Sequence, residues 1–386
     1  MNSTASSSTS RFLTMAILLF LTMASGCVLC CPKATPRPPG APANEVIQEF
    51  PAGGLMQTAW RVRWAEGPGK GLYITGAWFK RNPAEPWMRI LWDARVADIF
   101  VPYHTGSPRY YDLTGFSFGL EEAVPKDAGC CGALLGNPPK VVKEVRDRGV
   151  AWKDDQQVHR GQQLVLWGTV DAANYNYIIE YGFRDDGSIE FRLGATARNL
   201  PGREMEAHMH NGLWRIDMDL NGFPNDSALL ARHQEPAGGA TASDSANPFH
   251  DGTEGSAVWN PQEFTHVRVV DTVKTNGQGH NISYDLIPLR HGTARHVEPF
   301  TQADFWVTRY RGTELRYDLL PTYVSNGESV TNTDIVLWHI TPVHHMPRDE
   351  DGAFQGNIWR GSALVMWGGF DLRPRNLFDR TPLFPY

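Results

Sequence analysis

The chain has 386 residues, and its 36 Lys and Arg against 42 Asp and Glu give a formal net charge of −6. This mildly acidic balance argues against a nucleic-acid-binding protein, which normally presents a basic face. Hydrophobic residues make up 41% of the chain, so it can build a large core instead of remaining disordered. The 37 glycines and 27 prolines favour many short elements joined by turns.

The N-terminus has the pattern of an export signal. Arg11 precedes an apolar run of twelve residues, 12–23, which is too short to span a bilayer. The sequence ASGC then ends at Cys27 and resembles the processing box of a bacterial lipoprotein. We expect residues 1–26 to be a signal peptide and Cys27 to be lipidated, which would place the protein in the periplasm or at the cell surface. An ordinary signal peptide and an uncleaved anchor are the alternatives.

Residues 27–45 are rich in Pro and Ala, which is typical of a semi-rigid spacer, and 46–386 then form one domain. The five cysteines include two adjacent pairs, 30/31 and 130/131, whose disulfide connectivity the sequence does not determine. We interpret these cysteines as structural or incidental.

Alternation of apolar and polar residues predicts a mostly β body. The segments 175–183 and 188–197 flank an Asp-Gly turn and predict a hairpin. The Gly- and Ser-rich segment 236–257 is predicted to be a long surface loop. We therefore expect an all-β fold, a large antiparallel β-sandwich. Further strands are predicted at 164–170, 266–273, 334–343 and 362–370.

Two histidine motifs have the spacing of metal ligands. On a strand, His208 and His210 would point to the same face, so both could reach one ion. A metal needs at least a third ligand, and the pair His344 and His345 supplies a candidate. Because neighbours on a strand point in opposite directions, only one of the pair would bind. Three imidazoles with an open position suit copper or zinc, and the spacing does not choose between them.

A second, oxygen-rich set follows the first motif and precedes the second. Asp217 and Asp219 share one strand face, and Asp334 lies just before the strand that leads to the histidine pair. Hard carboxylate oxygens suit Ca²⁺. The alternative interpretation is a set of solvated aspartates at strand ends.

Four ordered segments resemble landmarks of the copper amine oxidase family. Residues 174–177 (NYNY) stand where that family has the Asn-Tyr-Asp/Glu-Tyr motif of its quinone-forming strand. Residues 208–219 match its H-x-H motif and the R-L-D that follows, with the same spacing. Residues 334–351 and 368–382 match its last two landmarks. The resemblance covers about residues 50–386, the catalytic domain, and implies a sandwich of the family's large "supersandwich" type.

The residues around Tyr103 are similar to the family's V-V-P-Y-G-D-P segment. The resemblance assigns Tyr103 to the tyrosine that hydrogen-bonds the quinone, Asp112 to the catalytic base and Tyr110 to a gate of the substrate channel. The spacing from Tyr103 to Asp112 is shorter than in the family, so Glu121 and Glu122 are alternative bases.

The resemblance further implies the cofactors and partners. Copper would be bound by His208, His210 and His345, and Tyr175 would be the precursor of topaquinone, with Asn174 beside it. A primary amine and O₂ would be the substrates, and aldehyde, ammonia and hydrogen peroxide the products. Family members are homodimers that exchange arms, so a homodimer is expected. No nucleic-acid partner is expected.

The same family motifs hold a peripheral calcium site. Its ligands would be the aspartate side chains and two main-chain carbonyls, from Asp217, Met218, Asp219, Asp334 and Ile335. Two positions beside the quinone tyrosine depart from the family pattern, because Asp171 replaces a Thr and Asn176 an acidic residue. Asp171 would either bring a negative charge near the cofactor or point to solvent. Val142 replaces a cysteine, so the family's disulfide to the 130/131 pair is not expected.

Three functions compete. The first is a copper- and quinone-dependent primary-amine oxidase, and the second is a non-catalytic copper-binding or structural lipoprotein with the same sandwich. The third is a three-histidine zinc hydrolase. Retention of both Tyr175 and Asp112 favours the oxidase, because a binding protein needs neither residue.

Overall fold

The computed structural model describes residues 34–35, 39–52, 56–104, 106–197, 200–235, 241–289, 295–313 and 315–382. The expected signal peptide, Cys27 and most of the predicted spacer lie outside these residues. Within the spacer, Thr35 already contacts the fold, because its main-chain N–H donates to the side chain of Gln48 at 3.0 Å. In the part of the chain that is described, no helix is long and apolar enough to cross a membrane.

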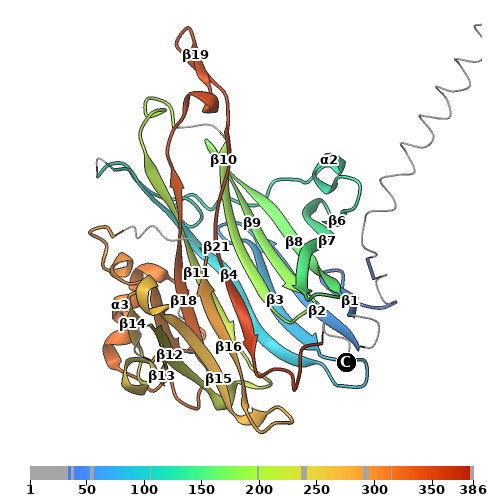
Figure 1. Ribbon diagram of the computed structural model, residues 1–386. Coiled ribbons are helices and arrows are strands. Elements are labelled where there is room, and N and C mark those ends of the chain that lie inside the picture. Colours follow the sequence, from blue (N-terminus) through green and yellow to red (C-terminus); the bar gives the residue numbers. More distant parts are fainter. Residues whose placement is uncertain are drawn as a thin grey trace, which may run out of the picture.

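Two large antiparallel sheets make up the fold (Figure 1). The first sheet has nine strands, and β5 pairs with β4 beside the main path. The strands of this sheet, in spatial order, are β1 (Glu45–Ala52), β2 (Met56–Gly67), β3 (Gly71–Lys80), β4 (Met88–Pro102), β11 (His208–Met218), β18 (Ile335–His345), β17 (Phe305–Arg309) and β14 (Gly255–Ala257), with β5 (Arg109–Tyr111) at the side.

The second sheet has ten strands. In spatial order these are β13 (Ser243–Pro248), β12 (Asp226–Gln234), β15 (His266–Thr275), β16 (Asn281–Pro288), β21 (Ala363–Arg375), β10 (Ile189–Ala197), β9 (Tyr175–Arg184), β8 (Val158–Ala172), β7 (Pro139–Lys153) and β6 (Ala133–Gly136). A small hairpin, β19 (Ala353–Gln355) and β20 (Ile358–Arg360), projects from one end of the molecule (Figure 1).

Helices are short and lie in the connections. Among the described residues the α-helices are α2 (Pro125–Ala128) and α3 (Leu320–Tyr323). The 3₁₀ helices are η1 (Phe223–Asn225), η2 (Phe249–Gly252), η3 (Pro261–Glu263), η4 (Pro299–Gln302), η5 (Tyr317–Leu319), η6 (Val324–Asn326) and η7 (Asp349–Asp351).

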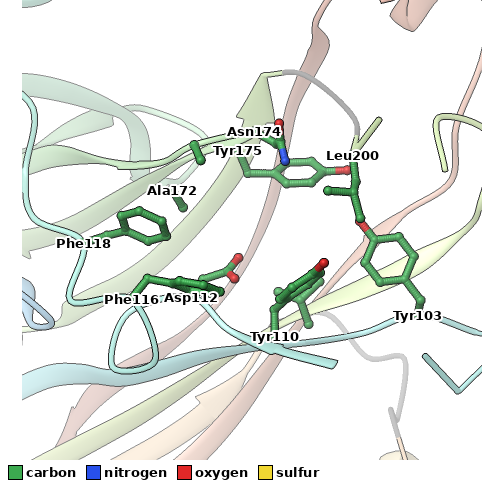
Figure 2. Close-up of a pocket in the computed structure, with 11 residues that line it drawn as sticks. Tyr103, Tyr110, Asp112, Phe116, Phe118, Ala172, Asn174, Tyr175 and Leu200 are labelled. Carbon is green, nitrogen blue, oxygen red and sulfur yellow. The ribbon is translucent and has the colours of Figure 1, made fainter. Parts of the chain in front are cut away.

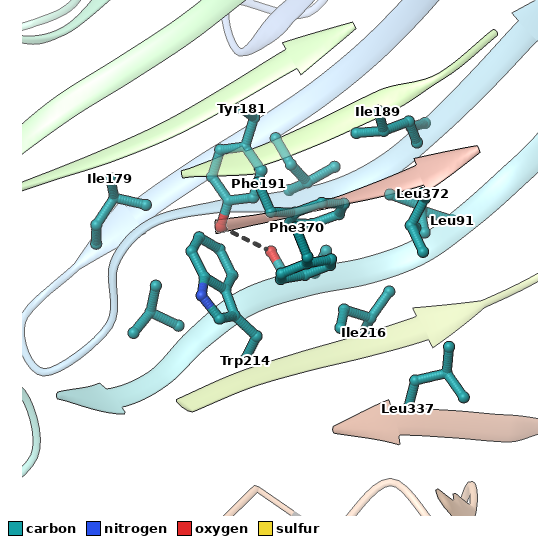
Figure 3. Packing of buried hydrophobic residues seen from close by; sticks show 14 of the residues in the cluster. Leu91, Ile179, Tyr181, Ile189, Phe191, Trp214, Ile216, Leu337, Phe370 and Leu372 are labelled. Atoms are coloured by element: carbon teal, nitrogen blue, oxygen red, sulfur yellow. Dashed lines mark hydrogen bonds between the residues drawn. The ribbon is translucent and has the colours of Figure 1, made fainter. Parts of the chain in front are cut away.

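The core lies between the two sheets (Figure 3). Phe191 of β10 and Phe370 of β21 stack with their ring centroids 4.5 Å apart. Trp214 of β11, in the other sheet, meets Phe191 edge-on at 5.5 Å. These interlocked rings bury large apolar areas, which stabilise the sandwich through the hydrophobic effect. The predicted hairpin and the predicted antiparallel sandwich are confirmed.

A second apolar cluster covers the outer face of the first sheet. Val336 and Trp338 pack into this cluster, whereas their neighbours Ile335 and Leu337 pack into the main core. Burial on both faces explains why this strand has an almost continuous apolar run instead of an alternating one.

The prediction of a surface loop over 236–257 is wrong in part. Ser243–Pro248 forms β13, which pairs with β12 at the sheet edge, and Gly255–Ala257 forms β14. All six residues of β13 are exposed, so this edge strand lacks the apolar alternation by which strands are found in a sequence.

Candidate active site

Three histidines meet at one end of the β11–β18 pair. The antiparallel register places His208 directly opposite His345, and His210 lies on the same face of β11 as His208. All three are buried, and their ligand nitrogens lie within 4.8 Å of one another. His344, which neighbours His345, is exposed. As expected for neighbours on a strand, His345 points into the cluster and His344 points away from it.

Hydrogen bonds orient these imidazoles. Nδ1 of His208 donates to the main-chain oxygen of Glu206 at 2.7 Å, which leaves its Nε2 as an acceptor. Nε2 of His345 lies 3.7 Å from a carboxylate oxygen of the buried Asp351. Burial lowers the pKa of all three histidines, that of His208 to about 4. The imidazoles are therefore neutral near pH 7, as metal ligation requires.

The hydroxyl of Tyr175 points into this cluster from the other sheet. It lies 3.1 Å from Nε2 of His208 and 3.2 Å from Nδ1 of His345. The Tyr175 ring meets the His210 ring at 4.5 Å between centroids. Tyr103 hydrogen-bonds to Tyr175 and stacks on His208 at 4.2 Å. Burial raises the pKa of the Tyr175 phenol, so the hydroxyl is protonated in the metal-free protein.

Tyr177 is a site residue that the sequence reasoning missed. It lies two positions after Tyr175 on the same face of β9 and is fully buried. Its hydroxyl donates to Oδ2 of Asp112 at 2.5 Å and lies 2.8 Å from Nδ1 of His210. Nε2 of His210 then has no hydrogen-bond partner among the described residues. The signal that could have found Tyr177 was the second tyrosine of the NYNY segment.

Asp112 is held rigidly beside the histidine cluster. Its main-chain N–H donates to the oxygen of Ile99 at 2.9 Å, just beyond the end of β5. The next residue, Leu113, donates its N–H to the buried carboxylate of Asp98 at 2.9 Å. Burial raises the pKa of Asp112 to about 7, while the hydrogen bond from Tyr177 opposes that rise. A carboxyl group with this pKa can accept a proton near neutral pH.

A cavity of about 200 Å³ joins Tyr175 to Asp112 (Figure 2). Figure 2 shows Tyr103, Tyr110 and Phe118 around the same space. The shorter spacing between Tyr103 and Asp112 thus does not prevent both from reaching it. The lining residues are Val101, Tyr103, Tyr110, Asp112, Phe116, Phe118, Ala172, Ala173, Asn174, Tyr175 and Leu200.

Asp171 and Asn176, the two residues near Tyr175 that differ from the family pattern, lie outside this cavity. Asp171 is exposed and pairs across the strands with Asn176, on the face opposite to Tyr175. The Asn176 amide donates to Glu121 at 2.8 Å, so Glu121 is also held away from the cavity. Glu122 is exposed and is not among the lining residues. Of the acids considered for the base, Asp112 is the one that lines the cavity.

These residues fit a metal ion with a phenol beside it. Nε2 of His208 and Nδ1 of His345 face the Tyr175 hydroxyl at 3.1 and 3.2 Å. Nε2 of His210 and Nε2 of His345 have no hydrogen-bond partner among the described residues. Three imidazole nitrogens suit copper, with a position left open for oxygen ligands. The hydroxyl of Tyr175 lies at this open side.

The aspartates lie at the opposite end of the same strand pair. Asp217 and Asp219 are buried, and each bonds one arginine, Arg215 at 3.3 Å and Arg89 at 3.0 Å. One oxygen of each carboxylate has no hydrogen-bond partner among the described residues. Asp334 is close enough to raise the pKa of Asp217 further, although burial is the main cause of the rise to about 8.

Asp226 joins this group and was not expected from the sequence. It is fully buried, and its pKa is raised to about 9, mainly by burial and then by Asp271, Asp219 and Asp334. Within the described ranges, the three histidines bring their ligand atoms within 4.8 Å of one another, and the aspartates do not. The expected ligands Met218 and Ile335 are both buried beside the carboxylates.

Comparison with known proteins places these residues in a family. The family model described as "Copper amine oxidase, enzyme domain" matches residues 201–385. This range includes the three histidines and begins after Tyr175 and Asp112. Primary amine oxidase 2 of Arabidopsis thaliana is 22% identical over 90% of this chain and 62% of its own length. Copper amine oxidase 1 of Aspergillus niger is 25% identical over 80% of this chain and 56% of its own.

The fold agrees with these matches. A copper-containing benzylamine oxidase from Hansenula polymorpha superposes with a TM-score of 0.69 at 17% identity, over 91% of this chain and 63% of that one. The chain thus spans between about half and three fifths of the length of these relatives. The matched enzyme domain over residues 201–385, the shared sandwich and the three-histidine cluster all make this chain similar to the copper amine oxidases.

Proposed function

We propose that this protein oxidises primary amines to aldehydes, with O₂ as the oxidant and ammonia and hydrogen peroxide as the other products. One observation carries the proposal. The Tyr175 hydroxyl lies within hydrogen-bond distance of two of the three clustered histidines, and Asp112 lines the same cavity as Tyr175. A copper-storage protein needs neither the buried tyrosine nor the carboxylate.

His208, His210 and His345 would bind the copper ion, and Tyr175 would be converted to topaquinone in place. When bound, these groups supply the two-electron oxidation that no ordinary side chain can perform. The protein supplies the surroundings. Its neutral imidazoles are ready to ligate, and Tyr103 holds the oxygen of residue 175 through a hydrogen bond.

Asp112 would remove the proton from the substrate carbon next to the nitrogen. Its raised pKa makes the carboxylate a stronger base than an exposed aspartate. Tyr177 fixes the carboxylate through the hydrogen bond to Oδ2, so the other oxygen is left for the substrate. The apolar lining keeps water from competing for this oxygen.

Reconstitution of metal-free protein tests the proposal. Copper and air should produce a visible quinone band and a coloured adduct with phenylhydrazine, followed by amine turnover. Tyr175→Phe should bind copper and give no band. Tyr181→Phe is a matched control, because Tyr181 lies on the same strand face and donates to main-chain oxygens of Leu72 and Ala94. Copper binding without any band in the wild type would support the non-catalytic alternative, and zinc-dependent hydrolysis would support the third.

A calcium ion at the aspartate group is a further part of the proposal. Buried carboxylates with unpartnered oxygens would be stabilised by a hard cation. The ligands would be Asp217, Asp219 and Asp334 with the carbonyls of Met218 and Ile335. Crystals grown with excess Ca²⁺ and an anomalous map at these residues provide the check.

We also propose attachment to the outer side of a bacterial membrane through lipid on Cys27. Stable anchoring takes two or more acyl chains, as lipoproteins carry. Wild-type protein should fractionate with membranes, and Cys27→Ser should release it. A soluble wild type with a different N-terminus would exclude this anchor.

We propose a homodimer from the resemblance to the copper amine oxidases. The projecting β19–β20 hairpin is the described segment best suited to reach a second subunit, because Phe354 and Ile358 on it are 54% and 56% exposed. Sedimentation should give the mass of two chains. Replacing both residues with Ser should weaken the dimer.

A further inference from the structure

The charge of the side chains that line the substrate cavity limits which amines it can bind. Among the described residues that line it, Asp112 is the one carboxylate, and none is a cation. Asp171 is nearby in sequence, yet it is exposed and its Oδ1 accepts the N–H of Ala173 at 2.9 Å. Glu121 is bonded to Asn176 on the other face of β9. A second positive charge on a bound substrate would therefore find aromatic faces but no second carboxylate among the described lining residues.

Four aromatic side chains form a continuous wall, which we call the aromatic wall. Tyr103 meets Tyr110 edge-on at 6.4 Å, and Tyr110 meets Phe116 at 6.1 Å. Phe116 stacks on Phe118 at 5.3 Å. The wall runs from the buried Tyr103 to Phe116, which is 54% exposed and marks the mouth. A single aromatic ring on a ligand could stack on, or meet edge-on, one or two of these side chains.

The size of the cavity limits the ligand. Its volume is about 200 Å³. A dry apolar cavity of roughly 150 Å³ in another protein binds a single benzene ring, so this space suits one ring and a short alkyl chain. It is smaller than the pockets of about 300–1,000 Å³ that accept drug-sized ligands.

We propose that this enzyme selects one-ring arylalkyl monoamines, such as 2-phenylethylamine, and discriminates against diamines. The inference rests on the proposed function. The amine would lie between Asp112 and Tyr175, and the ring would lie against the aromatic wall. A second ammonium group would lose part of its hydration near the mouth of the cavity without gaining a carboxylate partner, which is unfavourable.

Three amines test the selection. n-Hexylamine and 1,5-diaminopentane have the same number of heavy atoms and differ by one charge. We expect kcat/KM for n-hexylamine to exceed that for 1,5-diaminopentane by roughly tenfold, because the second ammonium loses part of its hydration without gaining a carboxylate partner. 2-Phenylethylamine should exceed n-hexylamine by roughly threefold to tenfold through ring stacking. Equal turnover of the diamine and n-hexylamine would overturn the inference.

Phe116 provides the decisive variants, because its exposure allows a polar replacement. Phe116→Glu should raise the diamine-to-hexylamine ratio by at least about tenfold, since it places a carboxylate where the second ammonium would lie. Phe116→Gln, which has the same shape without the charge, should leave that ratio near the wild-type value. If both variants change the ratio equally, charge is not the cause and the proposal fails.

Binding to metal-free Tyr175→Phe protein separates this inference from the proposed function. Calorimetry should show 2-phenylethylamine binding more tightly than 1,5-diaminopentane even where no cofactor forms. If wild-type protein gives no phenylhydrazine adduct, the proposed function fails while the cavity preference can still be measured. If the adduct forms and the diamine binds as tightly as the aromatic amine, the selection fails alone.

Discussion

The two ends of the β11–β18 strand pair hold opposite kinds of polar cluster. At one end, His208, His210 and His345 bring neutral nitrogens within 4.8 Å of one another. At the other end, Asp217 and Asp219 are just as deeply buried, but each is paired with an arginine. The ligand atoms of the three histidines are therefore close together, whereas those of the aspartates are farther apart.

The difference follows from the charge of the ligands. Neutral imidazoles repel one another little, so they can be packed closely in a buried site before any metal arrives. Buried carboxylates repel one another and lose hydration, so they must find arginines, protons or a cation. The histidine end is thus preformed, while the aspartate end still needs arginines, protons or a cation to offset its charge.

The largest effect is expected from breaking the histidine end. His345→Ala should abolish stoichiometric copper binding, the quinone band and amine oxidation, because it removes one of three ligands. His344→Ala is the matched control, since its side chain is exposed on the opposite face of β18. Metal analysis of both variants decides the assignment, which is wrong if His344→Ala loses copper while His345→Ala retains it.

The next effect concerns the base. Asp112→Asn should still form the quinone and its hydrazine adduct, because Asp112 is not a metal ligand, but turnover should fall by about 10²–10⁴-fold. In the wild type, kcat/KM should rise with pH through about 7 as Asp112 loses its proton. Glu121→Gln should keep normal activity. Near-normal turnover by Asp112→Asn would refute its role and leave the oxidase proposal in place.

The histidine cluster could be predicted from the sequence more completely than the aspartate cluster. Strand periodicity explained why His208 and His210 share a face and why one of His344 and His345 must point away. It could not show that the β11–β18 register sets His208 opposite His345, because pairing over more than a hundred residues is decided by the whole sandwich. Asp226 was missed for the same reason, since it lies on a strand of the other sheet.

The site residues in the β9 strand show a second limit. Tyr175 was identified by its resemblance to a motif, whereas Tyr177 looked like an ordinary core aromatic. Only the packing of the two sheets brings the Tyr177 hydroxyl to both Asp112 and His210. Polar contacts between sheets depend on side-chain directions that periodicity does not specify.

Tyr177→Phe should have an effect of intermediate size on both the base and a metal ligand, because the Tyr177 hydroxyl contacts Asp112 and His210. Losing the hydrogen bond to Asp112 removes an interaction that lowers its pKa, so the rise of kcat/KM should move to higher pH, by up to about one unit. Copper affinity should fall by about tenfold, because His210 loses the group that orients it. Tyr181→Phe should change neither. An unchanged pH profile in Tyr177→Phe would show that the contact is merely structural.

The smallest effect, a few °C in melting temperature, should come from the aspartate end. There the free energy of unfolding should decrease as pH rises. Burial raises the pKa of Asp217 to about 8 and that of Asp226 to about 9, against an ordinary value of 3.8. The folded protein therefore keeps protons that the unfolded chain releases above about pH 4. Without calcium, this contribution to stability is fully present below pH 4 and is lost as pH rises through 8 and 9.

The histidine end has the opposite sign, because the lowered pKa of His208 makes stability fall as pH decreases from 6.5 toward 4. Melting temperatures measured between pH 7 and pH 9 lie above that range, and above most of the titration of Asp112, so they report mainly on the aspartate cluster. We expect a decrease toward pH 9 in calcium-free protein, and Ca²⁺ should reverse it by replacing the lost protons. Asp226→Asn, which keeps the amide neutral at every pH, should flatten the decrease, and the exposed Asp155→Asn should not. A melting temperature that is independent of both pH and Ca²⁺ would mean that the two arginines alone neutralise this cluster.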